Sequence, residues 1–179
     1  MSNLEKIPVT ILTGFLGAGK TTLIRNLIIK NKSKRLAVII NEFGDLGVDG
    51  EIVKQCSDET CPEENILELA NGCICCTVAD DFVPTMQTLL DGKYLPEHIL
   101  IETSGLALPK PLLKAFEWPE IRSKLTVDSV LAVVDAEAVV NGVFAPQLSS
   151  EIEKRQKETY VEHETPLSEV FEDQINCSD

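Results

Sequence analysis

The chain has 179 residues, of which 44% are hydrophobic and 25% charged, a composition that suits one soluble globular domain with a sizeable core. Its formal net charge of −13 argues against a nucleic-acid partner, because a phosphate backbone requires clusters of Lys and Arg. No apolar run approaches the roughly 20 residues of a membrane span, and no signal region precedes the first apolar run, so we expect a cytoplasmic protein without a membrane partner.

The predicted elements alternate between strands and helices. Residues 7–14 ("IPVTILTG") predict a buried strand that ends in glycine, and Lys20–Lys30 has the spacing of a helix. Leu36–Asn41 ("LAVIIN") predicts a second buried strand, and residues 98–103 and 126–135 predict a third and a fourth. Near-continuous apolar strands separated by helices indicate an α/β fold, in which helices cover both faces of a mostly parallel sheet.

Three further segments have recognisable patterns. Residues 66–76 ("ILELANGCICC") predict a short hairpin whose turn is an Asn-Gly pair. Residues 80–92 predict a helix that ends at a glycine. Residues 165–175 predict another helix, capped by Thr165 with a proline at its first position. A βαβ rhythm calls for another strand after this helix, so we expect the 179 residues to be the N-terminal part of one larger domain.

The segment "GFLGAGKTT" matches the pattern G-x-x-x-x-G-K-[ST] between a strand and a helix, the context of a phosphate-binding loop. Its glycines let backbone N–H groups face phosphate oxygens, and the helix N-terminus adds a positive dipole end. We expect Lys20 to reach the β- and γ-phosphates and the Thr21 hydroxyl to ligate Mg²⁺. The alternative is a glycine-rich turn that binds nothing. The predicted nucleotide-binding residues are Gly14, Phe15, Leu16, Gly17, Ala18, Gly19, Lys20, Thr21 and Thr22.

The segment "LIETSG" provides the second strand end that a phosphate loop needs to hold a metal and to sense the γ-phosphate. Glu102 closes an apolar strand, where its carboxylate can hold Mg²⁺ through water, and Gly105 can offer its N–H to the γ-phosphate. We therefore assign catalytic roles to Lys20, Glu102 and Gly105, and magnesium binding to Thr21 and Glu102. The alternative is a strand-to-loop turn with an exposed glutamate.

The segment "NEFGDLG" follows the second predicted strand. Its two glycines and short acidic side chains suit a switch loop that rearranges. Glu42 in this segment is expected to face either the metal of the nucleotide or a second metal. A polar surface loop is the alternative.

Three thiols lie close together at Cys73, Cys75 and Cys76, a pattern that can bind a soft or borderline metal as thiolates. In an extended segment Cys73 and Cys75 point the same way and Cys76 the other way, so only two of them ligate without a kink. A third ligand comes from a kink at Cys76 or from elsewhere, with Glu42 as a candidate. An incomplete site of this kind suits a metal that must later leave.

Two other interpretations of the thiol cluster stay open. One is a buried cysteine-rich hairpin, since Cys is a good small core residue. The other is a redox pair, which the spacing disfavours because it is not Cys-x-x-Cys. Outside the cluster, Cys56 and Cys61 read as loop residues of an acidic stretch, and His98 and His163 as surface or capping residues.

Together, "GFLGAGKTT", "NEFG", "ELANGCICCT" and "ETSGLALP" resemble the CobW-type GTPases that handle metals, and the resemblance covers essentially the whole chain. It implies the fold of the P-loop GTPases of the signal-recognition and nickel-insertion class. It also implies that the chain binds Mg²⁺-GTP and Co²⁺ or Zn²⁺, hydrolyses GTP slowly and delivers the metal to a client protein. The resemblance further implies that residues 14–22 hold the phosphates and that Cys73, Cys75 and Cys76 include the thiolate ligands of the metal.

The segments "CPEENILELANGCICCTVADDF" and "HETPLSEVFEDQ" resemble the cobalamin-biosynthesis branch of that family. This similarity suggests cobalt supply for the corrin ring, with a cobalt chelatase as a candidate client. The ligands alone do not name the metal, because zinc ordinarily outcompetes cobalt at sites with the same ligands.

Two features of the family are not found in this chain. Its guanine-reading Asn-Lys-x-Asp lies on a later strand, and its smaller C-terminal domain is absent too, so these residues do not separate guanine from adenine. Two rival functions remain. One is a metal-storage or sensing module, or a zinc-allocating member of the same family, and the other is a P-loop ATPase or kinase with a structural metal.

Overall fold

The computed structural model describes residues 6–31, 33–41, 51, 53–69, 82–141 and 167–179. The strands in this part of the chain are β1 (Ile7–Thr13), β2 (Leu36–Asn41), β3 (Ile66–Leu69), β4 (His98–Glu102) and β5 (Leu125–Ala132). The helices are α1 (Lys20–Lys30), α4 (Val83–Leu90), α5 (Pro109–Ala115), α6 (Pro119–Arg122), α7 (Ala136–Val140) and α9 (Leu167–Asn176), with a short 3₁₀ turn η1 (Glu63–Asn65).

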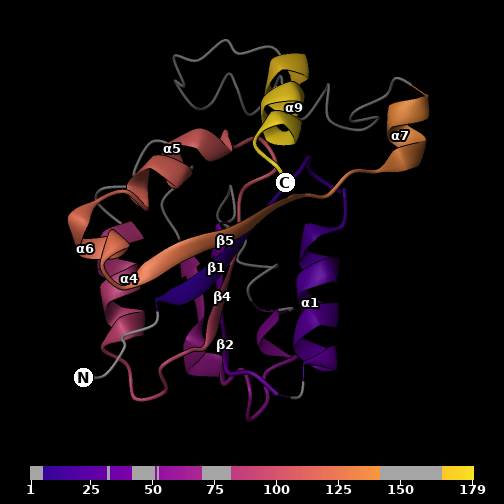
Figure 1. Ribbon diagram of the computed structural model, residues 1–179. Coiled ribbons are helices and arrows are strands. Elements are labelled where there is room, and N and C mark those ends of the chain that lie inside the picture. The colour runs from indigo at the N-terminus through magenta and orange to yellow at the C-terminus, as the bar shows by residue number, and fades with distance from the viewer. Residues whose placement is uncertain (1–5, 32, 42–50, 52, 70–81, 142–166) are drawn as a thin grey trace.

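The strands form one sheet in the order β3-β2-β4-β1-β5, and each neighbouring pair runs parallel (Figure 1). Their apolar side chains alternate between two core clusters, one on each face. On one face Ile39 and Ile101 pack with residues of α4, α5 and α6, and on the other Val38 and Leu100 pack with Ile24 of α1. Helices therefore cover both faces, and the predicted α/β architecture is confirmed.

The topology brings two loops together at one edge of the sheet. β1 lies between β4 and β5, and Leu12 of β1 is paired with Glu102, the last residue of β4. Because all strands run parallel, the loop after β1 and the loop after β4 leave from the same edge. In open α/β sheets, ligands bind at this carboxyl edge.

The first arm of the hairpin predicted over residues 66–76 is a strand, as expected. It is β3, Ile66–Leu69, which pairs in parallel with β2 from Val38↔Ile66 to Asn41↔Leu69 and is the outermost strand of the sheet among the described residues. The Asn-Gly signal is local, whereas the strand partner lies much earlier in the chain, so the local pattern did not reveal this pairing. The proposed turn and second arm lie outside the described residues.

Two other predicted elements differ from the structure by two residues or more at one end. The helix predicted over residues 80–92 is α4, Val83–Leu90, and the strand predicted over residues 126–135 ends at Ala132. The strand ends early because Asp135 caps α7, its carboxylate accepting a hydrogen bond from Ala138 N at 3.1 Å. The helix predicted over residues 165–175 is α9, and its predicted cap lies outside the described residues.

Helices α5 and α6 were not predicted, although each has a proline at its start, Pro109 and Pro119, which is a known signal for a first helical position. His98 is neither a capping nor a simple surface residue. It begins β4, its ring is half-buried, and its Nε2 lies 2.9 Å from Thr10 Oγ1 of β1. Burial, followed by the charge of Lys34, lowers the pKa of His98. The contact with Thr10 makes the imidazole a link between β4 and β1.

The described residues contain no helix that combines the length and apolar character needed to cross a membrane.

Candidate functional site

The loop between β1 and α1 has a backbone that only glycines adopt readily. Gly14, Gly17 and Gly19 have φ values of 131°, 76° and 99°. A Cβ added at Gly17 or Gly19 would meet no atom within 4 Å, so these two positions need glycine for their conformation and not for space. Helix α1 starts directly after Gly19 without a side-chain cap. Its first N–H groups have no partner within the helix and suit an anion.

Lys20 brings its charge into this loop. Its side chain is only 5% exposed, and Nζ donates hydrogen bonds to Gly14 O at 2.8 Å and Phe15 O at 3.0 Å. Phe15 O also accepts a hydrogen bond from Ala18 N at 3.2 Å. The ammonium group is thus held within the turn of the chain, beside the start of α1, where a phosphate group would face it.

Thr21 and Glu102 meet at the carboxyl edge of the sheet. Thr21 Oγ1 donates to Glu102 Oε1 at 3.0 Å and lies 3.2 Å from Oε2, and Glu102 is 5% exposed. A hydroxyl and a carboxylate are the hard oxygen donors that Mg²⁺ prefers. The two residues predicted to bind magnesium are therefore in contact, and their chemistry fits that ion.

Gly105 lies against the glycine-rich loop. A Cβ at Gly105 would be 2.5 Å from Leu16 N and 2.6 Å from Leu16 Cγ, so no other residue fits there without a shift of the backbone. The same segment is anchored to β1, because Thr103 N donates to Leu12 O at 2.9 Å. The loop after β4 therefore touches the loop after β1 directly.

The predicted ligands of the second metal, Cys73, Cys75, Cys76 and Glu42, lie outside the described residues. The described part of the chain contains no group of three or more His, Cys, Asp or Glu side chains that could hold a metal ion. It does show where the two segments that carry these ligands begin. β2 ends at Asn41 and β3 ends at Leu69, and these two residues are register partners at the carboxyl edge of the sheet.

Cys61 is a core residue within a loop, and the sequence interpretation of it as a loop residue is confirmed. It is fully buried on the α1 face of the sheet, and Asp58 accepts a hydrogen bond from its backbone N–H. Burial, followed by the charge of Asp58, raises the pKa of the Cys61 thiol to about 12, so it stays protonated. A protonated buried thiol is a poor metal ligand.

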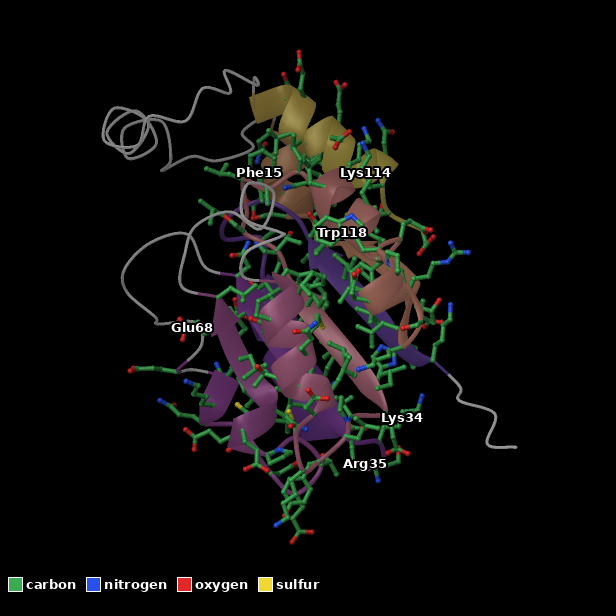
Figure 2. The ribbon with its side chains drawn as sticks, turned by 90° about the vertical axis from the view of Figure 1, so that its left-hand side faces the viewer. Phe15, Lys34, Arg35, Glu68, Lys114 and Trp118 are labelled. Atoms are coloured by element: carbon green, nitrogen blue, oxygen red, sulfur yellow. The ribbon has the colours of Figure 1, made fainter. Side chains whose placement is uncertain are left out.

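Sequence reasoning missed the contribution of α9. Phe171 lies against Phe15 of the glycine-rich loop, with ring centroids 5.7 Å apart, and the amide of Gln174 reaches the loop after β4. Figure 2 shows Phe15 at the end of the molecule where α9 lies, with Lys34 and Arg35 at the opposite end. The available signal was the position of Gln174 four residues after buried Val170, on the same helix face.

Known proteins are similar to this chain in sequence. The family model "CobW/HypB/UreG, nucleotide-binding domain" matches residues 8–179. The chain is 57% identical over 178 residues to the zinc chaperone CobW of a Sinorhizobium species, covering 99% of this chain and 50% of that protein. It is 39% identical over 143 residues to zinc-regulated GTPase metalloprotein activator 1 of Schizosaccharomyces pombe, covering 78% of this chain and 34% of that protein. The chain thus spans half the length of these relatives or less.

The fold also has a solved counterpart. The crystal structure of zinc-bound YjiA GTPase from Escherichia coli matches with a TM-score of 0.57 at 23% sequence identity, covering 98% of this chain and 48% of that chain. At this level of identity the likeness shows that the two proteins share a fold.

Proposed function

The chain belongs to the CobW/HypB/UreG nucleotide-binding family, and on this premise we propose that it binds Mg²⁺-GTP, hydrolyses it slowly and uses the nucleotide to control delivery of a transition metal. The contact between Thr21 and Glu102, beside the buried Lys20, is the observation that carries the nucleotide part of this proposal. A hydroxyl, a carboxylate and a fixed cation thus lie close together at the carboxyl edge of the sheet, and phosphoryl chemistry uses groups of these kinds.

The residues of the site would act by positioning and by electrostatics. Lys20 and the N-terminus of α1 would hold the phosphates. Thr21 and Glu102 would hold Mg²⁺, which neutralises charge that develops on the phosphate oxygens. The N–H of Gly105 would face the γ-phosphate, because Gly105 already abuts the glycine-rich loop. Glu102 is only 5% exposed, and the lower dielectric of a buried site strengthens the interaction of its carboxylate with a cation.

The metal part of the proposal concerns Cys73, Cys75, Cys76 and Glu42. Thiolates suit zinc and cobalt, and zinc is supported by the names of the relatives and by the general order of affinities. Cobalt supply for cobalamin synthesis, with a cobalt chelatase as client, is the more specific form of this hypothesis. Coupling between the nucleotide state and metal binding is supported by the ends of β2 and β3. The segments that carry these ligands follow Asn41 and Leu69, which are register partners in the sheet.

We further propose that the protein works in the cytoplasm, where cysteines stay reduced as thiols and are free to bind a metal. The receiving partner would be a client protein that takes the metal when the nucleotide state changes.

Replacing Thr21 by alanine is expected to weaken nucleotide binding mainly when Mg²⁺ is present. The hydroxyl that contacts Glu102 is then lost, so the ion loses one ligand, while the phosphate contacts of the backbone and Lys20 remain. We expect affinity for a non-hydrolysable GTP analogue in Mg²⁺ to fall by about tenfold, about 1.4 kcal/mol, with little change in EDTA. Isothermal titration in both buffers measures this difference.

Thr88→Ala is the matched control for that measurement, because Thr88 is an exposed threonine of α4 whose hydroxyl donates to Pro84 O of the same helix. An equal loss of affinity in Mg²⁺ and in EDTA for the Thr21 variant would show that Thr21 is not a magnesium ligand.

A further inference from the structure

Helix α9 covers the two loops of the candidate nucleotide site from a distant part of the sequence. Gln174 and Gly105 are 69 residues apart in the chain, yet the side chain of one bonds the backbone of the other. Figure 1 shows α9 beyond the carboxyl ends of the strands, at the end of the sheet from which both loops leave. The helix can therefore affect the site, although it contains no residue of the phosphate loop and neither of the expected magnesium ligands, Thr21 and Glu102.

Gln174 is the residue of α9 that reaches the loop after β4. It is fully buried, and its Nε2 donates to Gly105 O at 3.2 Å and to Ala107 O at 3.1 Å. The orientation of the amide is fixed, because its oxygen would face two carbonyl oxygens if the group were turned around. The buried Oε1 has no hydrogen-bond partner among the described residues.

The two bonds from Nε2 are what a glutamine contributes at this position. An apolar side chain of similar volume would fill the same space, but it would leave the carbonyl groups of Gly105 and Ala107 without these donors. What an apolar residue would not do is hold the two carbonyl groups of Gly105 and Ala107. The observation therefore points to a role in fixing this stretch of backbone.

Gly105 needs such a restraint. The close approach of Leu16 N, 2.5 Å from the position of a Cβ, excludes any side chain at this residue. A glycine without a side chain has a wide choice of backbone angles, so its peptide groups are not oriented by the residue itself. The hydrogen bond from Gln174 limits the backbone angles of Gly105, as a Cβ would do at another residue.

The same helix also contacts the other loop of the site. The ring of Phe171 lies 5.7 Å from the ring of Phe15, and Phe15 O accepts the hydrogen bond from Lys20 Nζ at 3.0 Å. Two residues of α9 therefore contact the two loops of the site. Phe171 packs on Phe15, whose carbonyl accepts the bond from Lys20, and Gln174 bonds Gly105, which is expected to meet the γ-phosphate.

We propose that Gln174 is a positioning residue for GTP, which orients the backbone of Gly105 so that its N–H faces the γ-phosphate. This inference rests on the proposed function, because it takes the γ-phosphate to lie between Lys20 and Gly105. GDP has no γ-phosphate and would not use the Gly105 N–H. Gln174 therefore determines how well the protein distinguishes GTP from GDP, and α9 senses which of the two is bound.

The test is the effect of Gln174→Met on the affinities for a non-hydrolysable GTP analogue and for GDP. Methionine keeps the volume of the side chain and removes both hydrogen bonds. We expect the GTP analogue to bind about tenfold more weakly, with GDP affinity nearly unchanged. A loss of about tenfold is the upper end of the effect expected from losing one hydrogen bond, here the bond that restrains Gly105. Glu172→Met is the matched control, since Glu172 is an exposed residue of the same helix, and it should change neither affinity.

An equal loss of affinity for both nucleotides, or no loss for either, would overturn the proposal. If Gln174→Met does not fold, Gln174→Asn takes its place, because the shorter amide no longer reaches both carbonyls and should shift the same ratio. A wild-type protein that binds neither nucleotide would contradict the proposed function itself. A wild-type protein that binds both, with an unchanged ratio in the Gln174 variants, would contradict only the role of Gln174.

Discussion

Lys20→Ala is expected to abolish nucleotide binding almost completely. Lys20 Nζ lies within the glycine-rich loop, bonded to Gly14 O and Phe15 O, and is the fixed cation that faces the expected phosphates. Alanine leaves backbone N–H groups as the remaining donors, and a loss of about 3 kcal/mol corresponds to more than a hundredfold in affinity. Titration with GTP and with ATP measures the effect and also shows which base the wild-type protein prefers.

Lys30→Ala is the matched control for this experiment. Lys30 is an exposed lysine at the last turn of the same helix, so the variant loses the same charge at the far end of α1. Thermal unfolding of both variants is needed beside the titration, because the Lys20 hydrogen bonds also hold the loop together. Unchanged GTP and ATP affinity in a well-folded Lys20 variant would contradict the assignment of this loop.

Gly14→Ala is expected to destabilise the folded protein strongly. The backbone at Gly14 has φ 131°, and a Cβ there would be 2.1 Å from Val133 O, a backbone atom directly after β5 that cannot move aside as a flexible side chain could. Strain and overlap together should cost about 3 kcal/mol or more. For a chain of this size that corresponds to a fall in melting temperature of roughly 10 °C.

Gly17→Ala separates the two causes. Gly17 also has a positive φ, 76°, but a Cβ there meets nothing within 4 Å, so only the backbone conformation is disfavoured. We expect a loss of about 1–2 kcal/mol for this variant. Urea unfolding of both variants gives the two free energies, and equal losses would show that the contact with Val133 does not matter.

The sequence predicted those parts of the site that lie on continuous segments. The glycine pattern and the apolar run before it place Lys20 and Thr21 at the start of a helix, and the apolar run before Glu102 places that carboxylate at a strand end. Parallel pairing then brings the two together, since Leu12 and Glu102 are register partners. These predictions depend on short-range patterns and on one general rule about parallel sheets.

The contacts that sequence reasoning missed join residues far apart in the chain. Pairing of β3 with β2 depends on Ile66 meeting Val38, whereas the Asn-Gly pair beyond β3 favoured a local hairpin. The bond from Gln174 to Gly105 is not visible in either segment, because each has an ordinary pattern by itself. The sequence signal was a glutamine at an apolar position of the helix, and this pattern does not identify the residue to which the glutamine bonds.

The central claim is that the nucleotide state controls how tightly the metal is held. By linkage, metal must tighten GTP binding by the same factor by which GTP tightens metal binding. A useful release needs at least about a tenfold change, or 1.4 kcal/mol of coupling. Cys73→Ser and Cys75→Ser should each weaken Zn²⁺ and Co²⁺ binding and leave GTP binding in place, because a hydroxyl is a poor ligand for these sites. Cys177→Ser, a change outside the cluster, is the control.

The most direct measurement is the affinity of the protein for Zn²⁺ and for Co²⁺ in the presence of Mg²⁺, with a non-hydrolysable GTP analogue in one titration and GDP in the other. We expect the GTP analogue to tighten binding of the cargo metal by about tenfold or more relative to GDP. Equal affinities in the two nucleotide states would contradict it, and the thiol cluster would then be a storage or structural site.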